Sequence, residues 1–190
     1  TYYLTLTEAL AAWTEGTTLT LLANAEISAP IAITESKTLD GNDKTLTYTG
    51  TDRAIDVPNT ANGANVTIKN LTVNAAKANR GINYNTTGEL TVEKVTVSIG
   101  ADVDGYAINF PSSADGANVT ITNSNLASRI PVNVWGSDMV IDITNTNITS
   151  LDDNANYTYS GIQLNNDTYG NVADGTVVNV TGGSITALDE

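Results

Sequence analysis

The side chains that most often perform catalysis are missing from this sequence. Its 190 residues include no histidine and no cysteine, which excludes imidazole bases, thiolate nucleophiles and the metal sites built on either. Acidic residues outnumber basic ones by 21 to 8, which gives a net charge of −13. That balance argues against a nucleic-acid partner or an anionic membrane surface, because both are bound through lysine and arginine.

The remaining candidates for acid–base chemistry are aspartates in predicted loops. Hydrolysis of a glycosidic bond needs two carboxylates roughly 5 to 9.5 Å apart, and no predicted strand face carries such a pair. The segment from Asp102 to Gly105 resembles part of a calcium loop, but the further ligand positions are missing. We therefore predict no catalytic residue, no metal ligand and no cofactor. The alternative is calcium at the acidic loops, which contain Asp102, Asp104, Asp115, Asp152, Asp153, Asp167 and Asp174.

A set of polar and aromatic residues recurs along the chain and predicts a ligand-binding surface. Each of the three arginines precedes an apolar position by two or three residues, and Tyr106 holds the same place in another copy. Aromatic rings and amides are common contacts to sugars, and arginine binds carboxylates through paired hydrogen bonds. The predicted binding residues are Arg80, Asn83, Tyr106, Asn109, Asn133 and Trp135. In the alternative, Arg53 pairs with a nearby aspartate, Trp135 packs under a loop and the amides bond one another.

These residues must be positioned by an internal repeat. Segments 66–73, 90–97, 119–126, 141–148 and 178–185 have apolar residues at positions 1, 3 and 8, and 38–46 is a looser copy. Alternation at the start of each segment predicts a strand with one buried face. The third-position residues recur every 22 to 37 residues and are Leu39, Ile68, Val92, Ile121, Ile143 and Val180.

A second strand family lies between these segments. Its apolar positions recur every 24 to 30 residues and are Ile55, Ile82, Ile108, Val132 and Ile162. Two interleaved families predict two parallel sheets around one core, with each turn of the chain stacked on the next. A third sheet is expected from the connecting segments. A β-sandwich is the alternative, but it gives no reason for the two families to alternate.

The predicted fold is therefore all-β, a right-handed parallel β-helix (a solenoid) of about six rungs. Asn70, Asn123 and Asn145 share one bend position, and we expect their side chains to hydrogen bond from rung to rung. We divide the chain into residues 1–36, an N-terminal cap with the first strands, and residues 37–190, the β-helix. The two parts form one continuous domain, and we expect it to be a fragment of a longer protein.

The cap is predicted as a short helix over residues 5–15. Thr5 and Glu8 match a capping box, and Leu6, Leu10 and Trp13 fall on one helical face. The helix would cover the open N-terminal end of the stack, where an unpaired edge would otherwise be exposed. Trp13 is therefore predicted to be a plug rather than a binding residue.

Three segments at the start of the chain resemble a known family. The helix at 5–12, the strand at 16–22 and the segment at 37–42 are similar to the opening of bacterial pectate-lyase-like right-handed β-helix proteins. The resemblance extends over nearly the whole chain, but its motifs are specific to fold rather than activity. Some such proteins cleave polysaccharides with carboxylate clusters, which this sequence does not offer. Many others are adhesins of the bacterial cell surface.

The sequence thus predicts a non-catalytic extracellular or cell-surface module of a bacterial protein. It would act as an adhesin or scaffold and bind an extended glycan, with a polysaccharide or a host surface glycan or protein as partner. The alternatives are a domain related to polysaccharide lyases or hydrolases, and a purely structural stalk. We expect a monomeric module without membrane insertion, because its apolar stretches are too short to span a bilayer.

Overall fold

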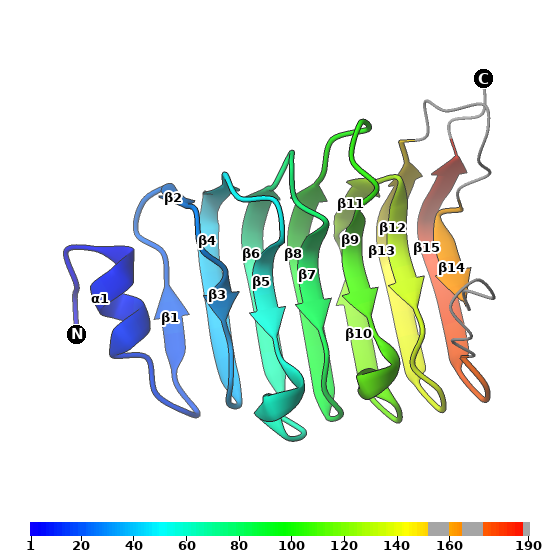
Figure 1. Cartoon of the computed structure of the whole chain (residues 1–190), viewed down its shortest axis with the longest axis horizontal. Helices are drawn as coiled ribbons and strands as arrows, with labels where there is room; N and C mark the ends of the chain where they lie inside the picture. Colours follow the sequence, from blue (N-terminus) through cyan, green and yellow to red (C-terminus); the bar gives the residue numbers. More distant parts are fainter. Residues whose placement is uncertain (152–159, 165–172, 188–190) are drawn as a thin grey trace.

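The fold is all-β, and every strand pair among the described residues is parallel. A computed structural model of the chain describes residues 1–151, 160–164 and 173–187. Their strands form a large and a small sheet, and the chain passes repeatedly from one to the other (Figure 1). The large sheet contains β1 (Thr18–Thr20), β2 (Ala25–Ile27), β4 (Lys37–Tyr48), β6 (Val66–Asn74), β8 (Glu89–Ser98), β10 (Asn118–Thr122), β11 (Asn125–Ser128), β13 (Val140–Ser150) and β15 (Val177–Ala187).

The small sheet supplies the face on which the candidate site lies. Short 3₁₀ turns, η1 (Asn59–Ala61) and η2 (Ser112–Ala114), follow two of its strands. Within the described ranges its six strands are, in chain order, β3 (Ile31–Ala32), β5 (Arg53–Val57), β7 (Arg80–Tyr84), β9 (Tyr106–Phe110), β12 (Ile130–Val134) and β14 (Ile162–Leu164).

The two sequence repeats correspond to the two sheets, which confirms that part of the prediction. The register pairs all six third-position residues of the first family in one row, extended by Leu19 in β1. The second family forms a matching row that Ile31 extends. The inner members of both rows are buried, while Val180 on β15 is 43% exposed. The core therefore lies between the sheets, as the spacing of apolar residues predicts.

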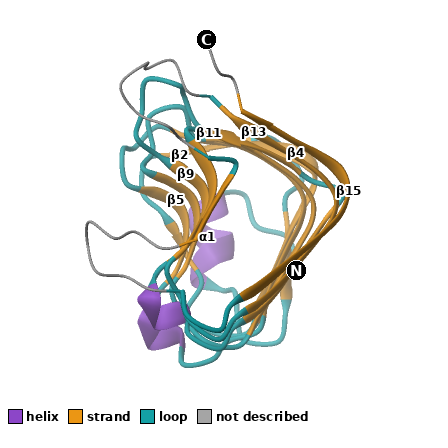
Figure 2. Ribbon diagram, turned by 90° about the vertical axis from the view of Figure 1, so that its right-hand side faces the viewer, coloured by secondary structure: helices purple, strands orange, loops and turns teal. Residues whose placement is uncertain are grey.

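The bend in the large sheet explains why asparagine recurs there. Asn70, Lys94, Asn123, Asn145 and Gly182 each have a positive φ, between 49° and 67°. Asparagine and glycine adopt this left-handed conformation at low cost. In the long strands the large sheet continues past this residue and turns a corner (Figure 2). The described strands form these two sheets, and the described connecting segments do not build the third sheet that we expected.

The predicted ladder of bend asparagines is wrong. Asn123 and Asn145 are exposed, and Asn70 instead donates from Nδ2 to Asp40 Oδ1 at 3.1 Å. A single left-handed residue reverses the usual alternation and points its side chain away from the core. The feature that the five bend positions share is thus the left-handed backbone conformation.

The N-terminal helix α1 (Leu6–Ala11) is shorter than predicted, since it ends before Trp13 rather than at residue 15. Its capping box is confirmed: the Glu8 backbone N–H donates to Thr5 Oγ1 and the Thr5 N–H donates to Glu8 Oε2, both at 3.2 Å. Trp13 is 8% exposed and donates from Nε1 to the Thr17 carbonyl. It packs into the end of the core, as a plug should. No helix in the described part of the chain is long and apolar enough to cross a membrane.

Replacing Ile121 with aspartate should unfold the protein. Ile121 is fully buried in the row of large-sheet anchors, so the variant would place an unpaired charge in the core at a cost of roughly 4 kcal/mol or more. Urea unfolding followed by circular dichroism measures this loss. Thr120→Lys, at the exposed neighbouring position whose register partner is Asp142, is the control and should retain nearly full stability. Equal stability of the two variants would contradict this placement of the core.

Replacing Lys94 with glycine should stabilise the protein by about 0.5 to 1 kcal/mol. Lys94 is exposed and occupies the left-handed bend with a φ of 53°, where a β-carbon is unfavourable. Glu93→Gly is the control, because Glu93 lies next to it in the same strand without a positive φ. That variant should lose stability in the same thermal unfolding assay. A loss in both would show that the bend is not left-handed at this position.

Candidate binding surface on the small sheet

The small sheet turns apolar side chains toward the core and amides toward its other face. On β7, Ile82 and Tyr84 belong to the core, and Asn83 between them points the opposite way. The Tyr84 hydroxyl donates to the Ala64 carbonyl at 2.9 Å. Burial raises the pKa of this phenol, and the nearby charge of Glu89 raises it further. The ring packs edge-on against Phe110, so the surface rests on a rigid aromatic layer.

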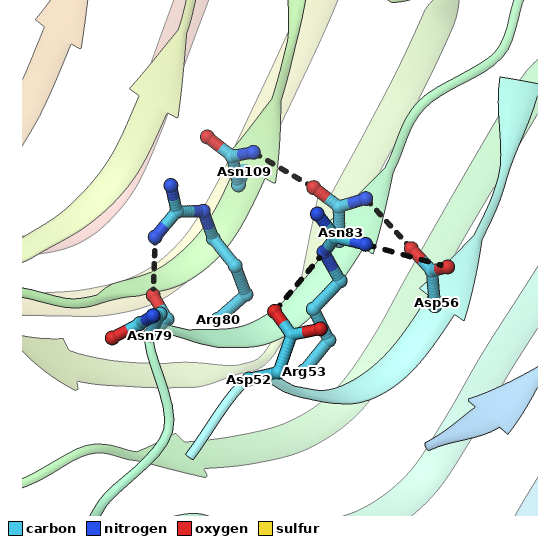
Figure 3. Close-up of polar contacts among 7 residues, drawn as sticks. All are labelled: Asp52, Arg53, Asp56, Asn79, Arg80, Asn83 and Asn109. Carbon is cyan, nitrogen blue, oxygen red and sulfur yellow. Dashed lines mark hydrogen bonds and ion pairs between the residues drawn. The ribbon is translucent and has the colours of Figure 1, made fainter.

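The outward amides form what we call the amide ladder: Asn83, Asn109 and Asn133. Asn83 Nδ2 donates to Asp56 Oδ1, and each later amide donates from Nδ2 to Oδ1 of the amide one strand earlier, with all three distances 2.7 Å. Figure 3 shows the first two of these bonds. A carboxylate can only accept, so Asp56 orients Asn83, and Asn83 in turn orients the rest. The ladder thus has one direction along the stack.

The amide ladder is buried, in contrast to the outward, accessible position that we expected. Asn83, Asn109 and Asn133 are 2%, 3% and 0% exposed. Their strands lie side by side in register, so each amide is covered partly by its neighbours. The alternative considered from the sequence, in which the amides bond one another, describes this geometry. The three Nδ2 groups and the oxygens of Asn83 and Asn109 are engaged before any ligand arrives, whereas Asn133 Oδ1 is buried without a hydrogen-bond partner.

The other three predicted residues do come together. The Arg80 guanidinium lies over the Tyr106 ring, 4.2 Å from its centroid, and the Tyr106 and Trp135 rings meet edge-to-face at 6.4 Å. Tyr106 is 9% exposed, whereas Arg80 and Trp135 are half-buried. Such a cation–π contact contributes about 0.5 to 2 kcal/mol. We call this group, Arg80, Tyr106 and Trp135, the cation–aromatic platform.

Charges beside the platform set its local electrostatics. Arg80 also donates from Nη1 to the Asn79 carbonyl at 2.8 Å. Partial burial lowers the pKa of Arg80, and the positive charge of Arg53 acts in the same direction, although arginine stays protonated in proteins. Arg53 lies 3.6 Å from Asp52 Oδ1 and 3.9 Å from Asp56 Oδ2, as the alternative anticipated. Arg129 donates from Nε to the Ala101 carbonyl at 2.7 Å.

Sequence reasoning left Arg53 out of the predicted binding set. A signal was nevertheless present, because Arg53 precedes Ile55 by two residues, as Arg80 precedes Ile82. In the structure the two arginines are register partners on adjacent strands. The predicted surface therefore carries two neighbouring arginines, Arg53 and Arg80, rather than Arg80 alone.

The acidic side chains that the structure describes do not assemble into a metal site. Across residues 1–151, 160–164 and 173–187, no three acidic side chains lie close enough together to hold a metal ion. Asp102 and Asp104 are exposed, and Asp115 Oδ1 accepts the Ser137 backbone N–H at 2.7 Å. Asp174 is exposed, and Asp152, Asp153 and Asp167 lie outside the described residues.

Comparison with known proteins gives no relative: no protein-family model, curated protein or solved structure matches this chain. The resemblance to pectate-lyase-like proteins therefore stays a prediction, and function has to be inferred from the geometry of the chain itself.

Replacing Asn109 with aspartate should destabilise the protein by about 3 kcal/mol at neutral pH. The variant loses the donor to Asn83 and sets a buried carboxylate against an amide oxygen. Because a protonated carboxyl can donate again, the stability difference from wild type should shrink as the pH falls. Unfolding measured at several pH values tests both effects.

Asn125→Asp is the matched control. Asn125 is exposed and only accepts, through Oδ1, from Asn147. A carboxylate can accept as well, so this variant should stay close to wild type at every pH. A loss at position 109 that does not depend on pH would show that the ladder bond is not its cause.

Proposed function

We propose that this chain is a right-handed parallel β-helix that serves as a non-catalytic binding module of a bacterial surface protein. It holds an extended ligand, in the first place a glycan, against the outer face of the small sheet. The β-helix is supported by the alternation of the chain between two parallel sheets around one core. The surface location is supported by the acidic, cysteine-free composition and by the family resemblance.

The cation–aromatic platform is the observation that carries the binding proposal. Its residues come from β7, β9 and the position after β12, so that it crosses three neighbouring strands. Neighbouring strands are about 4.8 Å apart, which is close to the length of one sugar unit in an extended glycan. A ligand lying across the strands would meet the Arg80 guanidinium and then the Trp135 ring.

The amide ladder prepares this platform for binding. Its bonds hold the strands under the platform in one register, so little conformational freedom is left to lose when a ligand arrives. Rigid aromatic side chains keep that cost low as well. Each contact of this kind nevertheless contributes little. Useful affinity would come from repetition along a polymer or between copies on a cell surface.

A non-catalytic role fits the charges on this face. Asp56 is the only acidic residue of the outward row, which continues through the three ladder asparagines to Gln163. Asp56 already accepts from Asn83 and faces Arg53. The row therefore offers no pair of carboxylates for glycoside hydrolysis.

A purely structural stalk is the second candidate. It is favoured by the burial of four predicted binding residues: Asn83, Tyr106, Asn109 and Asn133. A stalk needs the rigidity of the ladder but no accessible platform. The two functions differ in whether the exposed parts of Arg80 and Trp135 matter to any ligand.

A glycan-array screen with purified protein separates them. The binding module should retain a defined set of glycans, and Trp135→Ala and Arg80→Ala should each weaken binding by about tenfold, through the loss of roughly 1.4 kcal/mol. Tyr2→Ala, which removes an exposed aromatic ring at the N-terminus, should leave binding unchanged. Binding that neither platform variant alters would refute the platform. Absence of any glycan binding would favour the stalk.

A further inference from the structure

Arg53 and Arg80 form a pair of like charges at the N-terminal ends of two neighbouring strands of the small sheet. They are register partners at the start of β5 and β7, so that their backbones are about 4.8 Å apart. Figure 3 shows both side chains with their neighbours Asp52 and Asn79. In a protein with a net charge of −13, two adjacent arginines are a local exception. Asp52 and Asp56 offset part of the charge of Arg53, and a bound anion would reduce the repulsion that remains between the two arginines.

Most hydrogen-bonding capacity of this pair is unused. The contacts of Arg53 with Asp52 and Asp56, at 3.6 and 3.9 Å, are too long for hydrogen bonds. Its Nε is buried without a hydrogen-bond acceptor. Arg80 bonds only the Asn79 carbonyl and has no carboxylate within 4.0 Å in the described part of the chain. Each guanidinium carries several N–H donors in a planar fork, which matches the two oxygens of a carboxylate.

We propose that Arg53 and Arg80 are a carboxylate-binding dyad, and that the ligand is a glycan carrying isolated carboxylate groups. This inference rests on the proposed function and adds the chemical group that the surface selects. Asp52, whose side chain is 62% exposed beside Arg53, occupies in the free protein the place of the ligand carboxylate. A single-charge group is favoured over a polyanion, because the net charge of −13 repels a densely charged chain at long range.

The dyad can be observed directly, because the chain contains only three arginines. We would record the Nε–Hε resonances of ¹⁵N-labelled protein by NMR at mildly acidic pH, and assign them with Arg53→Lys and Arg80→Lys. Addition of glucuronate should shift the Arg53 and Arg80 signals to saturation. The Arg129 signal, whose Nε–H is held by Ala101, should not move. Glucose, which lacks the carboxylate, should shift none of them.

Two variants test the roles within the dyad by the same titration. Arg80→Lys loses the planar fork and should bind glucuronate about tenfold more weakly. Asp52→Asn removes the competing carboxylate and should bind roughly two- to fivefold more tightly. Glu26→Gln, which removes an exposed charge in β2 of the large sheet, is the charge-matched control and should bind as wild type.

The outcomes separate the dyad from the proposed function. Equal shifts of all three arginines, no shift at all, or weaker binding by Asp52→Asn would each overturn the dyad. If array binding is lost in Trp135→Ala but kept in both lysine variants, the binding module stands without the dyad. If the array shows no glycan bound although glucuronate shifts Arg53 and Arg80, the dyad is supported and the proposal of an extended glycan ligand is refuted.

Discussion

Parallel strands stacked in register are the constraint on which the rest of this structure depends. Each strand pairs its backbone groups with the strands on either side, so a residue at one position lies beside its counterpart in the next repeat. Because of this register, residues of the same type line up in rows that run across the strands. The apolar rows close the core between the sheets, and the left-handed bend recurs in the large sheet. Any polar row has to satisfy its hydrogen bonds along the same direction.

The outward row of the small sheet shows what this constraint does to candidate functional groups. Asparagine carries both a donor and an acceptor, so neighbouring asparagines can bond one another, and Asp56 at one end sets the direction. Only the oxygen at the other end, Asn133 Oδ1, is buried without a partner among the atoms of this ladder. Arginine cannot do this, because it donates without accepting. The same stacking that pairs the amides therefore leaves Arg53 and Arg80 beside each other with donors unused. Hydrogen-bond donors without an acceptor are thus found on residues that cannot bond their own kind.

The strands, their parallel order and their core could be predicted from the sequence, because apolar positions such as Ile108 and Ile121 recur at the spacing of the repeat. Burial on the outward face was not predictable, since alternation shows which way Asn83 points but not what covers it. We predicted the hydrogen-bonded asparagine ladder at the bend of the large sheet, whereas the structure has it in the small sheet. Asn123 at the bend and Asn109 in the small sheet recur at similar spacing, and only the sign of φ separates them. The end of α1 was missed because Ala12 through Glu15 includes no residue that stops a helix.

Distances between spin labels test the in-register stack most directly, and the absence of cysteine makes paired labelling simple. Thr18, Thr120 and Asn179 are exposed and lie in one row, with Thr120 four strands and Asn179 six strands from Thr18. At about 4.8 Å per strand, double electron–electron resonance should give about 19 Å for Thr18→Cys with Thr120→Cys. Thr18→Cys with Asn179→Cys should give about 29 Å. Distances that do not grow with the number of intervening strands would contradict the stack.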